Sequence, residues 1–232
     1  MRFKALATDY DGTIAHHGIV DPATVDALCR VKESGRKLLL VTGRELPDLF
    51  KVFSEVQIFH RVVAENGAVI YDPERDEQRA LADPPPPSFA ERLRELGVKR
   101  LSVGRVIVAT QEMDSGLVQK AIEECDVQLQ IIPNKGDIMI LPASVNKATG
   151  LQTALKDFDF DASAVVGVGD AENDAVFLDI CGLSVAVANA LPWLKERVDW
   201  VTPGDHGQGI RQLVRGLVES DLAGVALQGA AR

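Results

Sequence analysis

The sequence is poor in cysteine and contains no long hydrophobic run. Its three cysteines, Cys29, Cys125 and Cys181, are odd in number, far apart and set among apolar residues. This distribution predicts reduced, packed cysteines rather than a disulfide framework or a metal cluster. No segment approaches the roughly 20 apolar residues that span a bilayer. The stretch MRFKALATDYDGT also lacks the long apolar region of a signal peptide, and we therefore expect a cytoplasmic protein.

Positive charge is scarce relative to negative charge. There are 25 lysines and arginines against 34 acidic residues, and the net charge is −9. An excess of acid argues against nucleic acid or an anionic membrane as the main partner. It does not exclude a small anionic substrate, because a few local cations or a bound metal can reverse the field within one pocket. We therefore expect a small-molecule partner and a monomeric or homodimeric protein.

Apolar segments that alternate with helical patterns predict the fold class. The 232 residues allow one large domain or a domain with a smaller insert. Continuous apolar runs at 3–8, 37–41 and 164–170 predict buried strands. Helical patterns separate them, and one begins with Asp21 as its N-cap and Pro22 as its first residue. This order predicts an α/β protein with a doubly wound, Rossmann-like parallel sheet.

The middle of the chain interrupts this pattern. The segment DPERDEQRALADPPPPS is charged and then rich in proline, which is typical of a domain boundary. It is followed by helical patterns at 88–96 and 114–124, and by strand patterns at about 100–109, 127–132 and 137–141. We therefore expect a smaller α/β unit, residues 73–142, inserted into a core formed by residues 1–72 and 143–220. Residues 221–232 are expected to form a tail.

Two aspartates follow the first predicted strand. Asp9 and Asp11 are two positions apart and precede Gly12 and Thr13. Residues at i and i+2 of a strand point to the same face, and open α/β sheets bind ligands at the carboxyl ends of their strands. Aspartates are also common in turns before glycine. The pair alone is therefore consistent with either a site or a turn.

A second acidic group follows a later strand. The segment GVGDAEND contains Asp170, Asn173 and Asp174 within five positions. Each of these residues is a suitable helix N-cap, but a cap requires only one of them. If the two strand ends are adjacent, Asp9 and Asp11 share a crevice with this second group.

Such a crevice would need a counter-ion. Two carboxylates about 4 Å apart repel by roughly 4 kcal/mol at an effective dielectric constant near 20. Oxygen ligands without neighbouring histidine or cysteine favour a hard cation, and Mg²⁺ is the usual choice beside phosphate. The acidic residues therefore predict a Mg²⁺ site.

Polar and cationic residues complete the candidate site. Thr42, Gly43 and Arg44 directly follow the second buried strand, where a hydroxyl and backbone N–H groups are suited to bind an anion. Lys147 lies at the start of a predicted helix, where the helix dipole disfavours a cation, so its position indicates an anionic partner. The alternatives are an ordinary N-cap for Thr42 and a solvated surface side chain for Lys147.

The segments DYDGT, VTGR, the lysine at 147 and GDAEND, in this order, resemble the haloacid dehalogenase-like (HAD) superfamily of phosphohydrolases. The insert resembles the α/β (type IIB) cap of its Cof-type subgroup, as do the stretches AENGAVIYD and GDIMILPASVNKATGL. Sugar phosphatases and phosphoglycolate phosphatases are similar in plan. The resemblance implies a Mg²⁺-dependent phosphomonoester hydrolase that acts on a small phosphorylated metabolite.

The resemblance also implies roles for the acidic residues. Asp9 would be the nucleophile that forms an aspartyl-phosphate. Asp11 would be the general acid for the leaving oxygen and then the base for water. The metal would be held by the Asp9 side chain, the Asp11 backbone carbonyl and Asp170. Asp174 would supplement the metal site, and Asn173 would support the site or the substrate.

The remaining motif residues would bind the phosphate group. Thr42, the Gly43 backbone and Lys147 would contact phosphate oxygens and stabilise charge in the transition state. Gly12 and Arg44 are further candidates for substrate binding. In the predicted cap, Lys135 and Arg105 are candidate substrate contacts, with ordinary solvated turn residues as the alternative.

Two other functions remain open from the sequence. A sugar phosphomutase would use the same aspartyl-phosphate and return the phosphoryl group to a sugar. A non-catalytic binding or regulatory module on the same fold is the third hypothesis, although every acidic residue that the chemistry needs is present.

Overall fold

The strands predicted at both ends of the chain lie in one sheet. The computed structural model describes residues 1–226. Its large sheet has eight strands in the order β12-β11-β10-β1-β2-β3-β4-β5. These strands are β1 Ala5–Thr8, β2 Lys37–Val41, β3 Arg61–Ala64, β4 Val69–Asp72, β5 Glu77–Ala80, β10 Val165–Gly169, β11 Leu183–Ala186 and β12 Trp200–Val201. Neighbouring strands from β12 to β3 are parallel, and the pairs β3–β4 and β4–β5 are each antiparallel.

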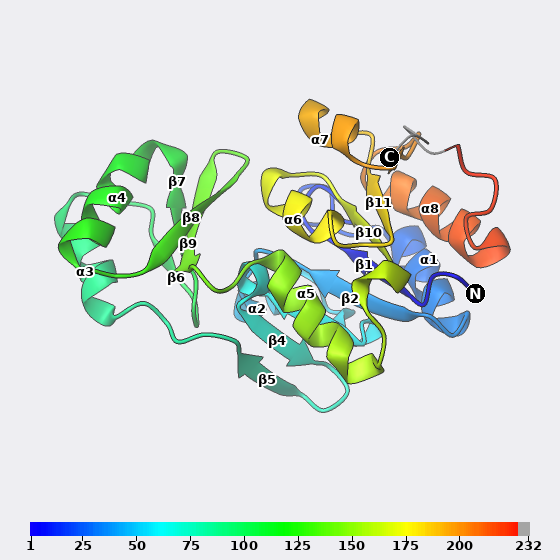
Figure 1. Ribbon diagram of the computed structural model, residues 1–232, viewed down its shortest axis with the longest axis horizontal. Helices are drawn as coiled ribbons and strands as arrows, with labels where there is room; N and C mark the ends of the chain where they lie inside the picture. Colours follow the sequence, from blue (N-terminus) through cyan, green and yellow to red (C-terminus); the bar gives the residue numbers. More distant parts are fainter. Residues whose placement is uncertain (227–232) are drawn as a thin grey trace.

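Helices cover both faces of this sheet (Figure 1). One face is covered by α1 Pro22–Glu33, α2 Leu46–Val52 and α8 His206–Ser220, and the other by α5 Lys147–Leu155, α6 Ala175–Leu178 and α7 Pro192–Arg197. Successive side chains of β1 point to opposite faces of the sheet. Leu6 packs into the core under α1, α2 and α8, whereas Ala5 and Ala7 pack into the core under α5, α6 and α7. The predicted doubly wound α/β architecture is confirmed.

The start of α1 follows the predicted capping chemistry. The Asp21 side chain accepts a hydrogen bond from the Thr24 backbone N–H, and Pro22 is the first helical residue. Proline lacks the N–H that would be unpaired at this position, and its fixed φ suits the first turn. Local sequence therefore determines where this helix begins.

A smaller α/β unit lies at the end of the molecule opposite to the chain termini (Figure 1). Its four-stranded antiparallel sheet has the order β6-β7-β9-β8. Its elements are α3 Pro87–Glu95, β6 Ser102–Val103, β7 Val108–Gln111, α4 Ser115–Glu124, β8 Leu129–Asn134 and β9 Asp137–Pro142. Phe89, Leu93 and Val118 contribute to a separate hydrophobic core between its helices and sheet.

The strand predicted at 100–109 is two strands. The chain turns between β6 and β7, where the backbone N–H groups of residues 105–107 bind a side chain of the large unit instead of a sheet partner. The turn residues Val106 and Ile107 pack into the core of the large unit, whereas Val103 of β6 is exposed. An apolar run therefore does not imply one continuous strand here.

The large sheet extends beyond the predicted boundary at residue 72. Strand β5 pairs with β4 at the sheet edge, although its residues fall in the range 73–142 that was expected to form the smaller unit. All four residues of β5, EQRA, are exposed. A polar edge strand shows no apolar alternation, and its backbone pairing could not be anticipated from the pattern.

The described part of the predicted tail docks against the core. The Asp221 carboxylate pairs with the Arg36 guanidinium at 2.8 Å, and Leu222 is buried. The rest of the tail, residues 227–232, lies outside the described residues. Across residues 1–226, no helix combines the length and the apolar character needed to cross a membrane.

Candidate active site

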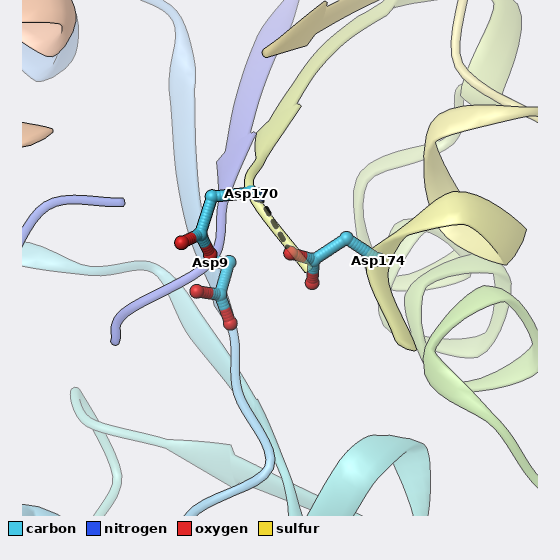
Figure 2. Close-up of side chains that lie close together, drawn as sticks. All are labelled: Asp9, Asp170 and Asp174. Atoms are coloured by element: carbon cyan, nitrogen blue, oxygen red, sulfur yellow. Dashed lines mark hydrogen bonds between the residues drawn. The ribbon is translucent and has the colours of Figure 1, made fainter. Parts of the chain in front are cut away.

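The topology brings the two predicted acidic groups together. Strands β1 and β10 are parallel neighbours, with Thr8 opposite Val168, so their carboxyl ends meet at the same edge. Asp9, Asp170 and Asp174 are buried and each contributes a carboxylate oxygen to a group within 4.8 Å. Figure 2 shows these three side chains close together. The proximity expected from the strand ends is therefore present.

Asp174 organises the turn after β10. One of its carboxylate oxygens accepts hydrogen bonds from the backbone N–H groups of Asp170, at 2.8 Å, and Ala171, at 2.9 Å. The first of these bonds is visible in Figure 2. A Cβ at Gly169 would lie 2.7 Å from the Asp174 side chain, so the close packing requires glycine. Asp174 thus holds the backbone that presents Asp170.

Lys147 is the central cation of the site. Its Nζ lies 2.7 Å from an Asp9 oxygen and 2.6 Å from an Asp174 oxygen, and the residue is 1% exposed. It occupies the first position of α5, which the Asn146 side chain caps by accepting from two backbone N–H groups. Lys147 is therefore a buried bridge between two carboxylates, and the alternative of a solvated surface lysine is excluded.

Burial and mutual repulsion act on these ionisable groups. Burial raises the pKa of Asp9 well above its ordinary value, and Asp174 raises it further against the opposing effect of Lys147. Burial and Asp174 together raise the pKa of Asp170 to about 6. Burial opposes the charge on Lys147, but the carboxylates of Asp174 and Asp9 raise its pKa above the ordinary value. The cluster holds more negative charge than its cations neutralise.

The Asp11 carboxylate is not part of the group formed by the other three. It forms a two-pronged ion pair with Arg44, whose Nε and Nη2 lie 2.7 and 2.8 Å from its two oxygens. Arg44 also pairs with Asp48. The Asp11 side chain is 47% exposed, whereas Asp9, which it was expected to accompany, is buried. The side chain of Asp11 therefore lies outside the buried group of three carboxylates.

A small cavity opens beside Asp9. Its volume is about 120 Å³. From the large unit it is lined by Asp9, Asp11, Gly43, Arg44, Ala171 and Asn173. The hairpin β8–β9 of the smaller unit supplies Asn134 and Met139 as the facing wall. Candidate residues that follow each of the strands β1, β2 and β10 therefore line one cavity that the smaller unit covers, although Asp170 and Asp174 are not among its lining residues.

Thr42 is a buried neighbour of this cavity rather than part of its wall. Its N–H donates to the Val63 carbonyl at 2.8 Å, and its hydroxyl accepts from the Arg44 N–H at 3.1 Å. The hydroxyl thus shapes the turn after β2 and lies next to Gly43 at the cavity wall. Thr42 is not the N-cap of α2, because Glu45 occupies that position.

Gly12 lies at a point of very close approach. Its φ is +82°, and a Cβ there would lie 2.1 Å from an Asp170 oxygen. The Gly12 carbonyl accepts a hydrogen bond from the Asn189 side chain at 2.7 Å, and the Thr13 hydroxyl donates to Asp170 at 3.2 Å. Asn189 and Thr13 were not among the predicted site residues. Asn189 follows β11, so the strand-end argument used for Asp9 would also have found it.

The turn between β3 and β4 contains two residues, Glu65 and Asn66, that contact the site or the smaller unit and that the sequence pattern did not indicate. The buried Glu65 carboxylate accepts hydrogen bonds from the backbone N–H groups of Arg105, Val106 and Ile107 at 2.7 to 2.9 Å. Asn66 accepts a hydrogen bond from the Asn173 amide at 3.0 Å. From sequence this segment is only a turn between strands, because both roles depend on distant partners.

The donor set fits Mg²⁺. The buried group of Asp9, Asp170 and Asp174 offers carboxylate oxygens, and the cavity wall adds no sulfur or imidazole ligand beyond the Met139 thioether. Hard cations prefer oxygen ligands, and Mg²⁺ needs only one or two protein carboxylates together with water and phosphate. Asp174 already uses one oxygen for two backbone N–H groups, so Asp9 and Asp170 are the better placed ligands.

Comparison with known proteins gives relatives along almost the whole chain. Residues 6–93 and 94–214 match the family described as haloacid dehalogenase-like hydrolase. A phosphoglycolate phosphatase from Methanothermobacter thermautotrophicus is 31% identical over 220 residues, which cover 91% of this chain and 97% of that protein. Another, from Haloarcula marismortui, is 28% identical over 219 residues, which cover 90% and 95%.

A solved structure shares the fold. A HAD/COF-like hydrolase from Plasmodium vivax aligns with a TM-score of 0.78 at 20% identity, covering 95% of this chain and 96% of that one. The family match and the curated relatives agree with the motifs after β1, β2 and β10. The chain therefore belongs to the haloacid dehalogenase-like hydrolase family, and its relatives place it among the phosphatases of that family.

Proposed function

We propose that this phosphatase is a Mg²⁺-dependent phosphomonoester hydrolase that acts on a small phosphorylated metabolite through an aspartyl-phosphate. One observation carries the proposal. Three buried carboxylates and a buried lysine converge at the ends of β1 and β10, beside a cavity of about 120 Å³. Burying so many charged groups lowers the stability of the folded protein. Binding of a divalent cation and a dianionic substrate would explain why these groups lie together.

Asp9 is the nucleophile in this proposal. One of its oxygens attacks phosphorus, the bond from phosphorus to the ester oxygen breaks, and Asp11 gives its proton to the departing oxygen. Asp11 then removes a proton from water, which attacks the phosphorus of the acyl-phosphate. Inorganic phosphate leaves and the Asp9 carboxylate is restored. Asp11 lines the cavity and retains solvent access. In this proposal its ion pair with Arg44 opens before Asp11 takes up the proton that it donates.

The other residues bind and orient the phosphate. Lys147 keeps one oxygen of Asp9 engaged at 2.7 Å, which leaves the other oxygen for attack. Gly43 and Asn173 line the cavity, and their N–H groups are suited to phosphate oxygens. Thr42 supports this wall. Bound Mg²⁺, held by Asp9 and Asp170, would neutralise developing charge on the phosphoryl oxygens.

The smaller unit, from α3 to β9, acts as the cap. Its hairpin β8–β9 closes the cavity with Asn134 and Met139, and Glu65 anchors its turn 105–107 to the large unit. Closure excludes bulk water from the reacting groups. The cavity beside Asp9 is small, about 120 Å³, which favours a small substrate. The relatives that are phosphoglycolate phosphatases are consistent with such a substrate.

Phosphate release in the presence and absence of Mg²⁺ tests this function. We expect the purified protein to release phosphate from small esters such as 2-phosphoglycolate, and EDTA to reduce the rate by about 10³-fold. Asp170→Asn should raise the Mg²⁺ concentration that gives half-maximal activity, whereas Asp26→Asn, at an exposed position of α1, should not.

Full activity in EDTA would contradict metal dependence. Formation of an isomeric sugar phosphate without free phosphate would identify a mutase instead.

A further inference from the structure

One cation of the cap reaches the buried carboxylates. Lys135 lies at the tip of the hairpin β8–β9, where Asn134 pairs with Asp137 across a two-residue turn. Both turn residues have positive φ, +48° at Lys135 and +87° at Gly136, as a tight hairpin turn requires. The Lys135 Nζ forms an ion pair with Asp170. The cap therefore presents an ammonium group beside Asp170.

The position of this ammonium group is built into the fold. The Lys135 N–H donates to the Glu172 carboxylate of the large unit at 3.1 Å, which holds the hairpin tip over the turn after β10. A Cβ at Gly12 would lie 2.8 Å from Lys135 Nζ, so the side chain packs directly against the first acidic motif. Neighbouring Asn134 lines the cavity. Arg105, the other cap cation considered from sequence, lines a separate groove beside Pro84–Pro87.

Among the cations near the buried carboxylates, Lys135 is the best placed to bind an anionic group of the substrate. Lys147 is fully engaged by Asp9 and Asp174 and is 1% exposed. Arg44 is held by Asp11 and Asp48. The side chain of Lys135 is 40% exposed, and its ammonium group pairs with Asp170. Asp170 is also a proposed ligand of the divalent cation. A cation on Asp170 would neutralise this carboxylate and free the ammonium group for another anion.

We propose that Lys135 is a specificity-determining residue that binds a second acidic group on the leaving group of the substrate. This inference rests on the proposed phosphatase function, and its new element is the residue that would bind the acid group of a phosphate monoester of a small hydroxy acid. Lys135 follows Asn134, which lines the cavity of about 120 Å³ beside Asp9, so a small acid that extends from the phosphate toward the hairpin tip would meet its ammonium group. An esterified alcohol of equal size without the acid would lack this ion pair.

Paired substrates test the role of Lys135. We compare kcat/KM for 2-phosphoglycolate and for 2-hydroxyethyl phosphate, which has similar size and no carboxylate. Lys135→Met should reduce the ratio of the two values by about 10- to 100-fold, as expected for the loss of a charge-assisted hydrogen bond. Lys135→Arg should retain most of the preference. Lys120→Met, at an exposed lysine of α4, should leave the ratio unchanged.

Two outcomes would overturn the inference. An equal loss on both substrates would show that Lys135 only supports the hairpin, and an unchanged ratio would show that it does not contact the acid. Binding to the Asp9→Asn protein gives a readout without turnover. There, adding Lys135→Met should weaken 2-phosphoglycolate binding by about 10-fold or more relative to 2-hydroxyethyl phosphate. Hydrolysis of 2-hydroxyethyl phosphate by the unmodified protein tests the phosphatase function separately.

Discussion

Replacing Asp9 with Asn is expected to reduce phosphate release by about 10⁴-fold or more, because an amide cannot form the acyl-phosphate. The side chain keeps its size, and its carbonyl oxygen can still face the Lys147 ammonium group, which lies 2.7 Å from Asp9. Burial and Asp174 disfavour the charged form of Asp9. Removal of this charge should therefore leave the free energy of unfolding in EDTA unchanged or raise it.

The combination of lost activity and retained stability is the informative result. Steady-state phosphate release and thermal unfolding are measured on the same preparation. Asp26→Asn, on the exposed side of α1, is the matched control and should behave like the unmodified protein in both assays. Substantial phosphate release by Asp9→Asn would contradict the assignment of Asp9 as the nucleophile.

Replacing Lys147 with Met is expected to lower the free energy of unfolding by about 3–5 kcal/mol in EDTA, the usual cost of removing one partner from a buried ion pair. Lys147 bridges Asp9 and Asp174 and is 1% exposed. Methionine fills a similar volume but supplies no charge. The carboxylates of the cluster then repel one another with only the ammonium group of Lys135 nearby. Mg²⁺ should restore part of the loss, so it should stabilise the variant more than the unmodified protein.

Denaturant unfolding with and without Mg²⁺ measures this difference. Lys156→Met provides the control, because Lys156 is an exposed residue at the end of the same helix, α5. Its effect should stay within about 0.5 kcal/mol. If Lys147→Met were as stable as the control in EDTA, the view of Lys147 as the buried counter-ion of the site would be wrong.

Much of the site could be predicted because it depends on topology. Parallel strands place their carboxyl ends at the same edge, so acidic residues after two strands, Asp9 and Asp170, meet without any knowledge of side-chain packing. Lys147 was also recognisable, since a lysine at a helix start is disfavoured unless an anion is near. The fold class followed from continuous apolar strands separated by helices.

Other features depend on contacts between distant segments, and no local pattern reports them. Glu65 binds backbone N–H groups about 40 positions later in the chain, and only the docking of the cap creates this contact. The ion pair between Asp11 and Arg44 separates Asp11 from the buried carboxylates, although a regular strand would have kept Asp9 and Asp11 together. Strand β5 is polar and pairs only through its backbone.

The most direct test of the central claim is to trap the phosphorylated enzyme. Asp11→Asn removes the proton donor and base, but p-nitrophenyl phosphate has a good leaving group that needs little protonation. This variant should therefore form the aspartyl-phosphate and hydrolyse it slowly. After acid quenching, peptide mass spectrometry should show the mass of one phosphoryl group on Asp9, and none in the Asp9→Asn/Asp11→Asn protein. Phosphate release by Asp11→Asn without any such modification, or a modification on another residue, would contradict the account.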